Sequence, residues 1–142
     1  MIEGSCLCGA VTIRLAAHDP AVTACHCRMC LRWTGGPFAG FDAPVEAVSI
    51  SGKVAIYASS AFAERAFCPR CGSHLWFRDT VPAGRPYEFP PGLFPAADGF
   101  PLTREVYADR APRWARFAGA HDRVGAAEYE TDNPFVREGD VP

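Results

Sequence analysis

Short apolar runs separated by turn residues make up the first two-thirds of the chain, and no apolar pattern of helical period extends beyond about two turns. Apolar and polar residues alternate over 11–15, which predicts a half-buried strand. Residues 45–50 and 54–57 predict two strands joined as a hairpin by the Ser-Gly turn between them. Residues 65–68 and 74–78 predict a second hairpin. The pattern therefore indicates a mainly β fold.

The remainder of the chain has weaker signals. Residues 81–101 contain six Pro and three Gly, too many helix and strand breakers for a regular element, so we expect a long ordered loop or lid. Residues 103–107 predict a strand, 112–117 a short helical turn and 126–130 a last short strand. We expect a single domain that spans residues 1–142, with a flexible C-terminal tail from residue 134.

Composition narrows the class of protein. Of the 142 residues 49% are apolar and 21% are charged, as in globular proteins rather than disordered or collagen-like chains. The net charge of −2 gives no reason to expect nucleic acid or an anionic membrane as partner. Residues 1–5 lack the features of a secretory signal, and no run approaches the roughly 18 apolar residues of a membrane span. We therefore expect a cytoplasmic protein with reduced thiols.

The seven cysteines are the unusual feature of this composition. An odd number of cysteines at very short spacing disfavours a pure disulfide scaffold, and clustered thiols in a reducing compartment are typical of metal or catalytic sites. Alternate residues of an extended segment project to the same side, so a C-x-C pair can offer two sulfurs to one ion. All seven lie in three clusters: Cys6 and Cys8; Cys25, Cys27 and Cys30; Cys68 and Cys71.

Seven thiols divide naturally into four and three. The C-x-C pair at residues 6–8 and the C-x-x-C pair at residues 68–71 together offer four sulfurs, enough to close a tetrahedral zinc site, and Gly72 suits the tight turn after the second pair. Sequence alone leaves open which pairs share a metal. The middle cluster has three cysteines, which is the ligand number of a catalytic zinc with one open position. Two other interpretations stay open for it: a second structural site completed by His26, His74 or another side chain, and a redox role.

Each residue that flanks the middle cluster has two possible structural roles. His26 lies between two candidate ligands and should point away from their metal, while His74 could face the site or pack nearby. Arg28 and Arg32 either hold positive charge beside a thiolate-rich site or lie on a solvated face.

Three aromatic residues follow the middle cluster, and they form either an apolar wall beside the open metal position or part of the core. They are Trp33, Phe38 and Phe41.

Three segments of the chain resemble one enzyme family. Gly4-Ser5-Cys6-Leu7-Cys8-Gly9-Ala10-Val11, Cys25-His26-Cys27-Arg28-Met29-Cys30 with Trp33-Thr34-Gly35 and Phe38, and Phe67-Cys68-Pro69-Arg70-Cys71-Gly72-Ser73 are similar in order and spacing to the glutathione-dependent formaldehyde-activating enzymes. The resemblance covers residues 4–78, and after Phe77 it is looser.

The resemblance implies a fold and a set of sites. The fold would be a zinc-bound β-tent of short antiparallel sheets with few short helical turns, and it would carry two zinc ions. Cys6, Cys8, Cys68 and Cys71 would hold the structural zinc, and Cys25, Cys27 and Cys30 the catalytic one. Arg28 and Arg32 would then steer an anionic substrate towards the open position.

The activity implied is that of a carbon–sulfur lyase of the S-(hydroxymethyl)glutathione synthase type. Such an enzyme adds a small thiol, glutathione or a similar molecule, to an aldehyde or cleaves the adduct. Two other classes remain: a zinc-stabilised binding module without catalysis, and a redox or metal-buffering thiol protein. The substrate and the oligomeric state are left open by the sequence.

Overall fold

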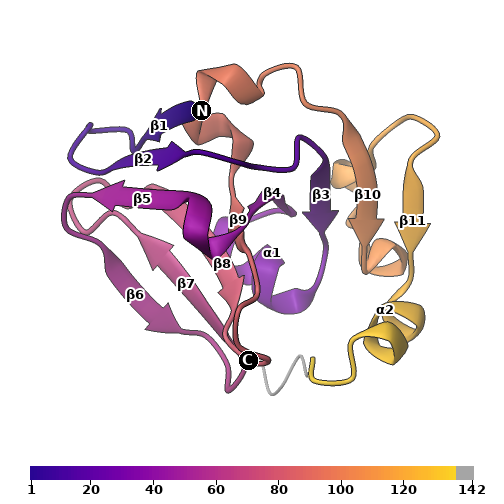
Figure 1. Cartoon of the computed structure of the whole chain (residues 1–142). Coiled ribbons are helices and arrows are strands. Elements are labelled where there is room, and N and C mark those ends of the chain that lie inside the picture. Colours follow the sequence, from indigo (N-terminus) through magenta and orange to yellow (C-terminus); the bar gives the residue numbers. More distant parts are fainter. Residues whose placement is uncertain (137–142) are drawn as a thin grey trace. The chain divides into compact units, whose positions relative to one another are not determined.

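The mainly β class is confirmed by the computed structural model, which describes residues 1–136. Within that range the chain forms eleven strands, two α-helices and several single 3-10 turns (Figure 1). None of the helices in this part of the chain has the length and apolar character needed to cross a membrane. Residues 137–142, most of the expected flexible tail, lie outside the described residues.

The chain divides into two compact units. Met1–Ala21 and Gly40–Pro101 form the first unit, and Val22–Ala39 with the chain from Leu102 onward form the second. Each unit contains its own cysteine cluster, so each is described separately. The single-domain organisation expected from the sequence stays a prediction.

A three-stranded antiparallel sheet in the first unit contains the alternating segment expected after Gly9. Its order is β1 (Ile2–Ser5), β2 (Thr12–Leu15) and β5 (Val48–Ser51). Ile13 and Leu15 of β2 are fully buried while the residues between them are exposed, as the alternation predicts.

Five further strands form an antiparallel arrangement in the first unit. Its order is β4 (Phe38–Ala43, in this unit from Gly40), β9 (Tyr87–Phe89), β8 (His74–Asp79), β7 (Ala63–Phe67) and β6 (Ala55–Ala58). The predicted second hairpin is confirmed, because β7 and β8 pair with Phe67 opposite His74. This pairing positions the knuckle that carries Cys68 and Cys71 at the end of the two strands.

The first predicted hairpin is wrong, because β5 and β6 do not pair with each other. Instead β5 pairs with β2, and β6 pairs with β7. Gly52 has a φ of +104°, and a Cβ there would lie 2.1 Å from the Ala10 carbonyl oxygen. The Ser51–Gly52 turn thus packs against the backbone that precedes β2. It connects β5 of the three-stranded sheet to β6 of the other sheet. A 3-10 turn, η1 (Val45–Ala47), replaces the start of the predicted strand over 45–50.

Residues 81–101 contain more order than the Pro and Gly content predicts. They include β9 and two 3-10 turns, η2 (Pro91–Leu93) and η3 (Pro95–Ala97). The expectation that no regular element forms is therefore wrong at β9. Burial explains the difference: a Cβ on Gly4 would lie 2.6 Å from the Phe94 ring, so this segment packs tightly onto β1.

The core of the first unit is built around Phe41, which is fully buried. Its ring centroid lies 5.3 Å from those of Phe94 and Phe100, both edge to face, and 6.3 Å from that of Phe89. Trp76 contacts Tyr87 and Phe89 in the same geometry. Offset and edge-to-face pairs of this kind add about 0.5–1.5 kcal/mol each beyond area burial.

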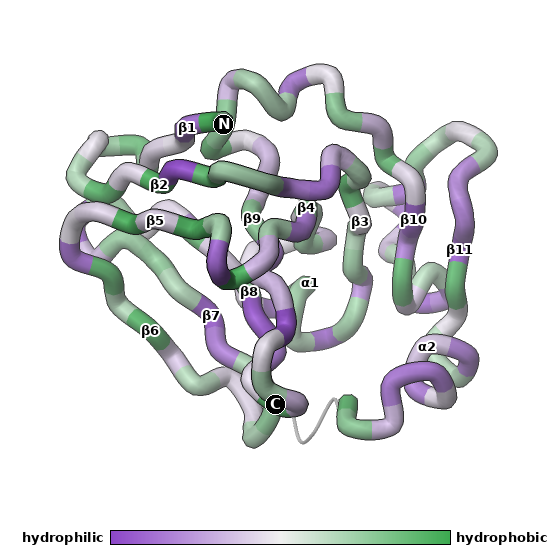
Figure 2. The backbone as a smooth tube through the Cα atoms, in the orientation of Figure 1, coloured by the Kyte–Doolittle hydropathy of each residue, from purple (hydrophilic) through white to green (hydrophobic). Residues whose placement is uncertain are grey.

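Parallel strands characterise the second unit, and the sequence did not indicate them. The order is β11 (Asp122–Val124), β10 (Leu102–Val106) and β3 (Val22–Cys25), with both pairs parallel. Parallel neighbours require crossover connections, and β3 and β10 are separated by more than 70 residues of chain. β11 is hydrophilic at Asp122 and Arg123 and buries only Val124 (Figure 2).

Two helices complete the second unit, α1 (Arg28–Thr34) and α2 (Ala126–Asp132). The strand expected over 126–130 is wrong, because the Asp109 carboxylate accepts a hydrogen bond from the Ala126 amide at 2.8 Å and starts a helix there. The strand over 103–107 is confirmed by β10, and the helical turn over 112–117 by η5 (Arg113–Ala115). A further 3-10 turn, η4 (Ala108–Arg110), follows β10.

Carboxylates crowd one position of the first unit. Glu88 of β9 lies opposite Asp42 of β4, and Asp79 ends β8 beside it. Burial, with a smaller contribution from the charges of Asp42 and Asp79, raises the pKa of Glu88 to about 8 against the opposing effect of Arg65 and Arg85. The folded protein therefore holds a proton that the unfolded chain, with an ordinary Glu pKa of 4.5, releases.

We expect Glu88→Gln to stabilise the protein increasingly as pH rises from 5 to 8. Between the two pKa values the folded wild type binds more protons than the unfolded chain, so its stability falls with rising pH, and the neutral amide removes that loss. Urea denaturation at pH 5 and pH 8 measures the difference, with exposed Glu46→Gln as the matched charge control. A gain that does not depend on pH, or an equal gain in the control, would contradict the assignment.

Candidate metal centres

Four cysteine sulfurs converge in the first unit. Their Sγ atoms all lie within 4.8 Å of one another, with Cys6 Sγ 3.6 Å from Cys8 Sγ and Cys8 Sγ 3.9 Å from Cys68 Sγ. Cys71 is the fourth member. Cys6 and Cys68 are buried, Cys71 is partly exposed and Cys8 is exposed. The two pairs that we expected to share one metal are thus brought together, and this four-sulfur group could hold a metal ion.

Backbone geometry holds these sulfurs in place. Gly9 and Gly72 have φ values of +74° and +76°, and their amides donate to the carbonyl oxygens of Cys6 and Cys68 at 3.0 and 2.8 Å. Only glycine adopts this left-handed backbone at little cost. The Val11 amide also donates to Cys6 Sγ at 3.3 Å. Each turn therefore places two sulfurs close to the two sulfurs of the other turn, as binding of one metal ion by four cysteines requires.

The ionisation of these thiols is uneven. The Ser73 hydroxyl, 3.2 Å from Cys71 Sγ, and the Ser73 amide lower the pKa of Cys71 to about 5. The Ala10 amide lowers the pKa of Cys8, but burial and the neighbouring sulfurs of the group outweigh it and raise that pKa to about 11. Four sulfurs this close cannot all be thiolates without a cation between them. Their arrangement accordingly fits a metal ion.

Three more cysteine sulfurs converge in the second unit. Cys25 ends β3, Cys27 is the N-cap of α1 and Cys30 lies in the first turn of that helix. Their Sγ atoms lie within 4.8 Å of one another. The Cys30 amide donates to Cys27 Sγ at 3.3 Å, and the Cys27 amide donates to Cys25 Sγ at 3.5 Å. A strand end and a helix start, neither of which the sequence pattern predicted here, position this three-sulfur group.

Within the part of the chain that the structure describes, the three-sulfur group has no fourth member. Among residues 1–136, no histidine nitrogen or carboxylate oxygen joins the three sulfurs. The neighbouring thiols of Cys27 and Cys30, together with burial, raise the pKa of Cys25 well above its ordinary value. A cation among the sulfurs would relieve this repulsion. The group could therefore hold a metal ion with one position left for another ligand.

His26 does not complete the group. Its side chain is fully buried, and Nε2 donates to Glu105 Oε1 at 2.6 Å. Glu105 pairs with Ala24 in the parallel ladder, whereas Val106 pairs with Cys25. Because successive side chains of a strand point to opposite faces, His26 and Glu105 share the face opposite Cys25. The geometry agrees with the expectation that His26 points away from the sulfurs.

Glu105 organises a buried network that the sequence did not reveal. Its second oxygen, Oε2, accepts from His121 Nε2 at 2.5 Å and lies 3.3 Å from Arg123 Nε. Burial raises the pKa of Glu105, but the hydrogen bonds from His121 and His26 outweigh it and hold the pKa below its usual value. The network ties β3, β10 and β11 together, and β3 leads through His26 to Cys27, the N-cap of α1. No spacing rule joins residues 26, 105, 121 and 123, so tertiary contact alone identifies them.

The two arginines expected to bind substrate lie on α1. Arg28 is the first residue of the helix and Arg32 follows one turn later, so both project from one face, and both are exposed. Arg28 directly follows Cys27. Their position beside the three-sulfur group agrees with a steering role but does not test it.

The expected aromatic wall is divided between the two units. Trp33 and Phe38 of the second unit contact each other at a ring distance of 5.8 Å, whereas Phe41 is buried in the first unit's core. His74 starts β8 in the first unit, where burial and the charge of Arg65 lower its pKa. His74 is not a member of either cysteine group.

The fold and these groups together define a mainly β protein with two all-cysteine groups that could hold metal ions, one of four sulfurs and one of three. Comparison with known proteins identifies the family. A model described as "Glutathione-dependent formaldehyde-activating enzyme" matches residues 1–110, and the chain belongs to that family.

Individual relatives agree with this assignment. A protein of Schizosaccharomyces pombe (strain 972) named as an uncharacterized lyase is 36% identical over 117 residues, which cover 82% of this chain and 85% of the relative. A Halomonas elongata protein that carries the provisional name of a glutathione-dependent formaldehyde-activating enzyme is 34% identical over 91 residues, 56% of this chain and 57% of that protein. The crystal structure of a Rhodobacter sphaeroides protein has a similar fold, with a TM-score of 0.58 at 21% identity over 73% of this chain and 99% of that one.

We expect Glu105→Ala to lower the free energy of unfolding by about 2–4 kcal/mol, because it leaves the buried His26 Nε2 donor without its acceptor. Urea denaturation at pH 7 of the metal-loaded protein measures the loss. Glu128→Ala on exposed α2 is the matched control and should change stability by no more than about 0.5 kcal/mol. Similar losses in the two variants would show that the network does not hold the strands.

Proposed function

We propose that this protein is a zinc-dependent carbon–sulfur lyase that adds a small thiol, glutathione or a similar molecule, to an aldehyde such as formaldehyde, or cleaves the adduct. One observation carries the proposal. The three-sulfur group of Cys25, Cys27 and Cys30 has no fourth ligand among the described residues, whereas the group of Cys6, Cys8, Cys68 and Cys71 has four. Membership of the formaldehyde-activating family supports the same chemistry.

The proposed cofactor is two zinc ions, one in each cysteine group. Thiolate sulfur is a preferred ligand of zinc, four cysteines make a closed structural site, and three protein ligands with an open position make a catalytic one. In the three-sulfur group zinc would supply a positive charge that stabilises a thiolate or polarises a carbonyl oxygen. Cys25, Cys27 and Cys30 are the residues that we assign to the catalytic centre.

The reaction is an addition that needs no oxidant or reductant. The substrate sulfur forms a bond to the carbonyl carbon, the carbon–oxygen π bond breaks, and the thiol proton is transferred to that oxygen. Cleavage of the adduct is the reverse. Because no electrons are gained or lost overall, the protein must bind and orient the two partners and stabilise the thiolate.

The chain's own residues can perform this orientation. Cys27 accepts the Cys30 amide as the helix N-cap, which keeps its sulfur at a defined position. Arg28 and Arg32 place two positive charges on the same face of α1, where they would attract a carboxylate-bearing thiol. We therefore assign substrate binding to these two arginines.

Location and partners belong to the same proposal. Seven reduced cysteines suit the cytoplasm, which keeps thiols reduced. The net charge of −2 offers no support for a nucleic acid partner. The partner that we propose is a small-molecule thiol or its aldehyde adduct.

We expect the zinc-loaded protein to accelerate exchange between formaldehyde and glutathione, measured by proton exchange NMR, and to contain two zinc ions per chain. Cys27→Ser should retain one zinc and lose the acceleration while the protein stays folded, because a serine hydroxyl still caps α1. Cys30→Ala provides an independent test if the first variant fails to fold. A wild type that carries both metals but gives no acceleration over a metal-free control would favour a zinc-stabilised binding module instead.

Neutralising the arginines should affect binding more than turnover. We expect Arg28→Gln and Arg32→Gln each to raise KM for glutathione about two- to fivefold with little change in kcat, as befits exposed charges that attract an anion. Arg14→Gln, an exposed arginine of β2 paired with Glu3 at 2.7 Å, is the control. Equal KM values in all three variants would remove the steering role.

A further inference from the structure

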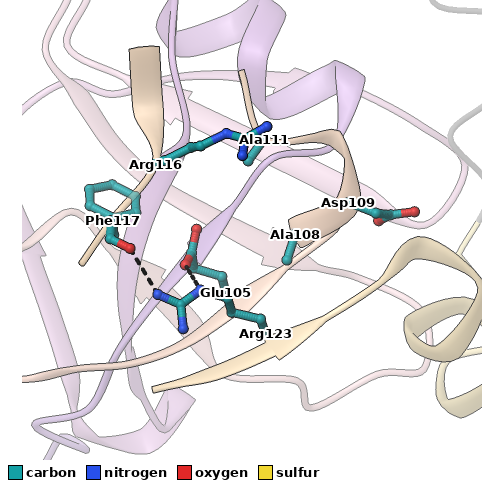
Figure 3. Close-up of a pocket in the computed structure, with 7 residues that line it drawn as sticks. All are labelled: Glu105, Ala108, Asp109, Ala111, Arg116, Phe117 and Arg123. Atoms are coloured by element: carbon teal, nitrogen blue, oxygen red, sulfur yellow. Dashed lines mark hydrogen bonds and ion pairs between the residues drawn. The ribbon is translucent and has the colours of Figure 1, made fainter. Parts of the chain in front are cut away.

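A pocket of about 430 Å³ lies within the second unit, on the side of β10 that carries the Glu105 network (Figure 3). That volume falls within the range of small-molecule sites. The end of β10, the turns η4 and η5 and strand β11 contribute its lining residues, which are Glu105, Ala108, Asp109, Ala111, Arg116, Phe117 and Arg123.

Two of the four charged lining residues neutralise each other. Glu105 Oε2 lies 3.3 Å from Arg123 Nε, and the same carboxylate accepts from two histidines. Arg123 also donates from Nη2 to the Phe117 and Gly119 carbonyl oxygens at 2.8 and 3.0 Å, and Figure 3 shows its bonds to Glu105 and Phe117. The Glu105 carboxylate and the Arg123 guanidinium therefore already have partners within the wall of the pocket.

The third charge, Asp109, is also occupied. Its Oδ1 accepts the Ala126 amide at 2.8 Å at the start of α2. In Figure 3 its carboxylate is directed away from Arg116 and Arg123. A negative charge at a helix N-terminus is compensated by the helix dipole.

Arg116 is the remaining charge. It is exposed, and among the described residues no ion pair or hydrogen bond engages its guanidinium. Figure 3 shows its side chain extended over the pocket towards Ala111. The other lining groups, Ala108, Ala111 and the ring of Phe117, are apolar. The pocket therefore combines an apolar wall with one cation that has no counter-ion among residues 1–136.

This pocket is separate from the three-sulfur group. Glu105 is paired with Ala24 and Val106 with Cys25 in the β3–β10 ladder. Strand side chains alternate between faces, so the pocket's Glu105 and the Cys25 thiol project from opposite faces of β3 and β10. A ligand in the pocket would not be a ligand of the cysteine sulfurs.

We propose that this pocket is a second ligand site, which binds a small organic carboxylate. The carboxylate pairs with the guanidinium of Arg116, whose planar fork matches two carboxylate oxygens. The apolar body of the ligand packs against Phe117, Ala108 and Ala111. The site is independent of the thiol-addition chemistry, so its failure and the failure of the proposed function are measured separately.

The test uses benzoate, which carries a carboxylate on an apolar ring, and benzamide as its neutral counterpart, each titrated into the zinc-loaded protein. Backbone amide shifts in a two-dimensional nitrogen–proton NMR spectrum report the site. We expect benzoate to shift residues 105–117 and 123 in a saturable way, and benzamide to bind at least about tenfold more weakly, the loss typical of a charge-assisted hydrogen bond.

Arg116→Gln should weaken benzoate binding by about tenfold or more. Arg113→Gln is the matched control, because it removes the same charge from the same short turn but does not line the pocket. Three results would overturn the proposal: equal binding of benzoate and benzamide, equal losses in the two variants, or benzoate shifts confined to residues 25–34 beside the three-sulfur group. An unchanged spectrum at saturating benzoate would overturn it as well.

Discussion

Repulsion between crowded thiolates is the constraint on which both units of this protein depend. Seven sulfurs are gathered into two groups in which every Sγ lies within 4.8 Å of the others. Such groups hold together as thiolates only around a cation, and the neighbouring sulfurs that help to raise the pKa of Cys8 show this repulsion inside one group. The glycine turns, the Ser73 hydroxyl and the N-cap of α1 all serve to hold sulfur atoms close against this repulsion.

Strand alternation gives the second unit two chemically different faces. Cys25 and His26 are neighbours in sequence, yet one joins the sulfurs and the other joins the buried carboxylate of Glu105. The alternation of side chains along a strand thus separates a face with cysteine sulfurs from a hydrogen-bonded face within two residues. The carboxylate network fixes the three parallel strands, and the helix that has Cys27 as its N-cap and contains Cys30 starts shortly after β3.

Local pattern predicted well wherever short-range chemistry decides the structure. The strand over 11–15, the hairpin of β7 and β8, and the division of thiols into four and three follow from alternation and spacing. Failures occurred where distant contacts outweigh local preference. β9 forms within a Pro-rich segment because its aromatic residues bury against β8, and α2 replaces a predicted strand because Asp109 caps it.

The sequence by itself determined the class of fold, the family and the three local cysteine clusters, since each depends on residues only a few positions apart or on motifs of fixed spacing; that the pairs at residues 6–8 and 68–71 lie together was established by the structure. Tertiary structure decided everything that joins distant segments. It paired β5 with β2 rather than with β6, set three strands parallel, and placed Glu105 between His26 and His121. Such pairings depend on which buried polar groups and strand edges meet in the folded chain. The spacing of residues along the sequence does not predict which of them meet.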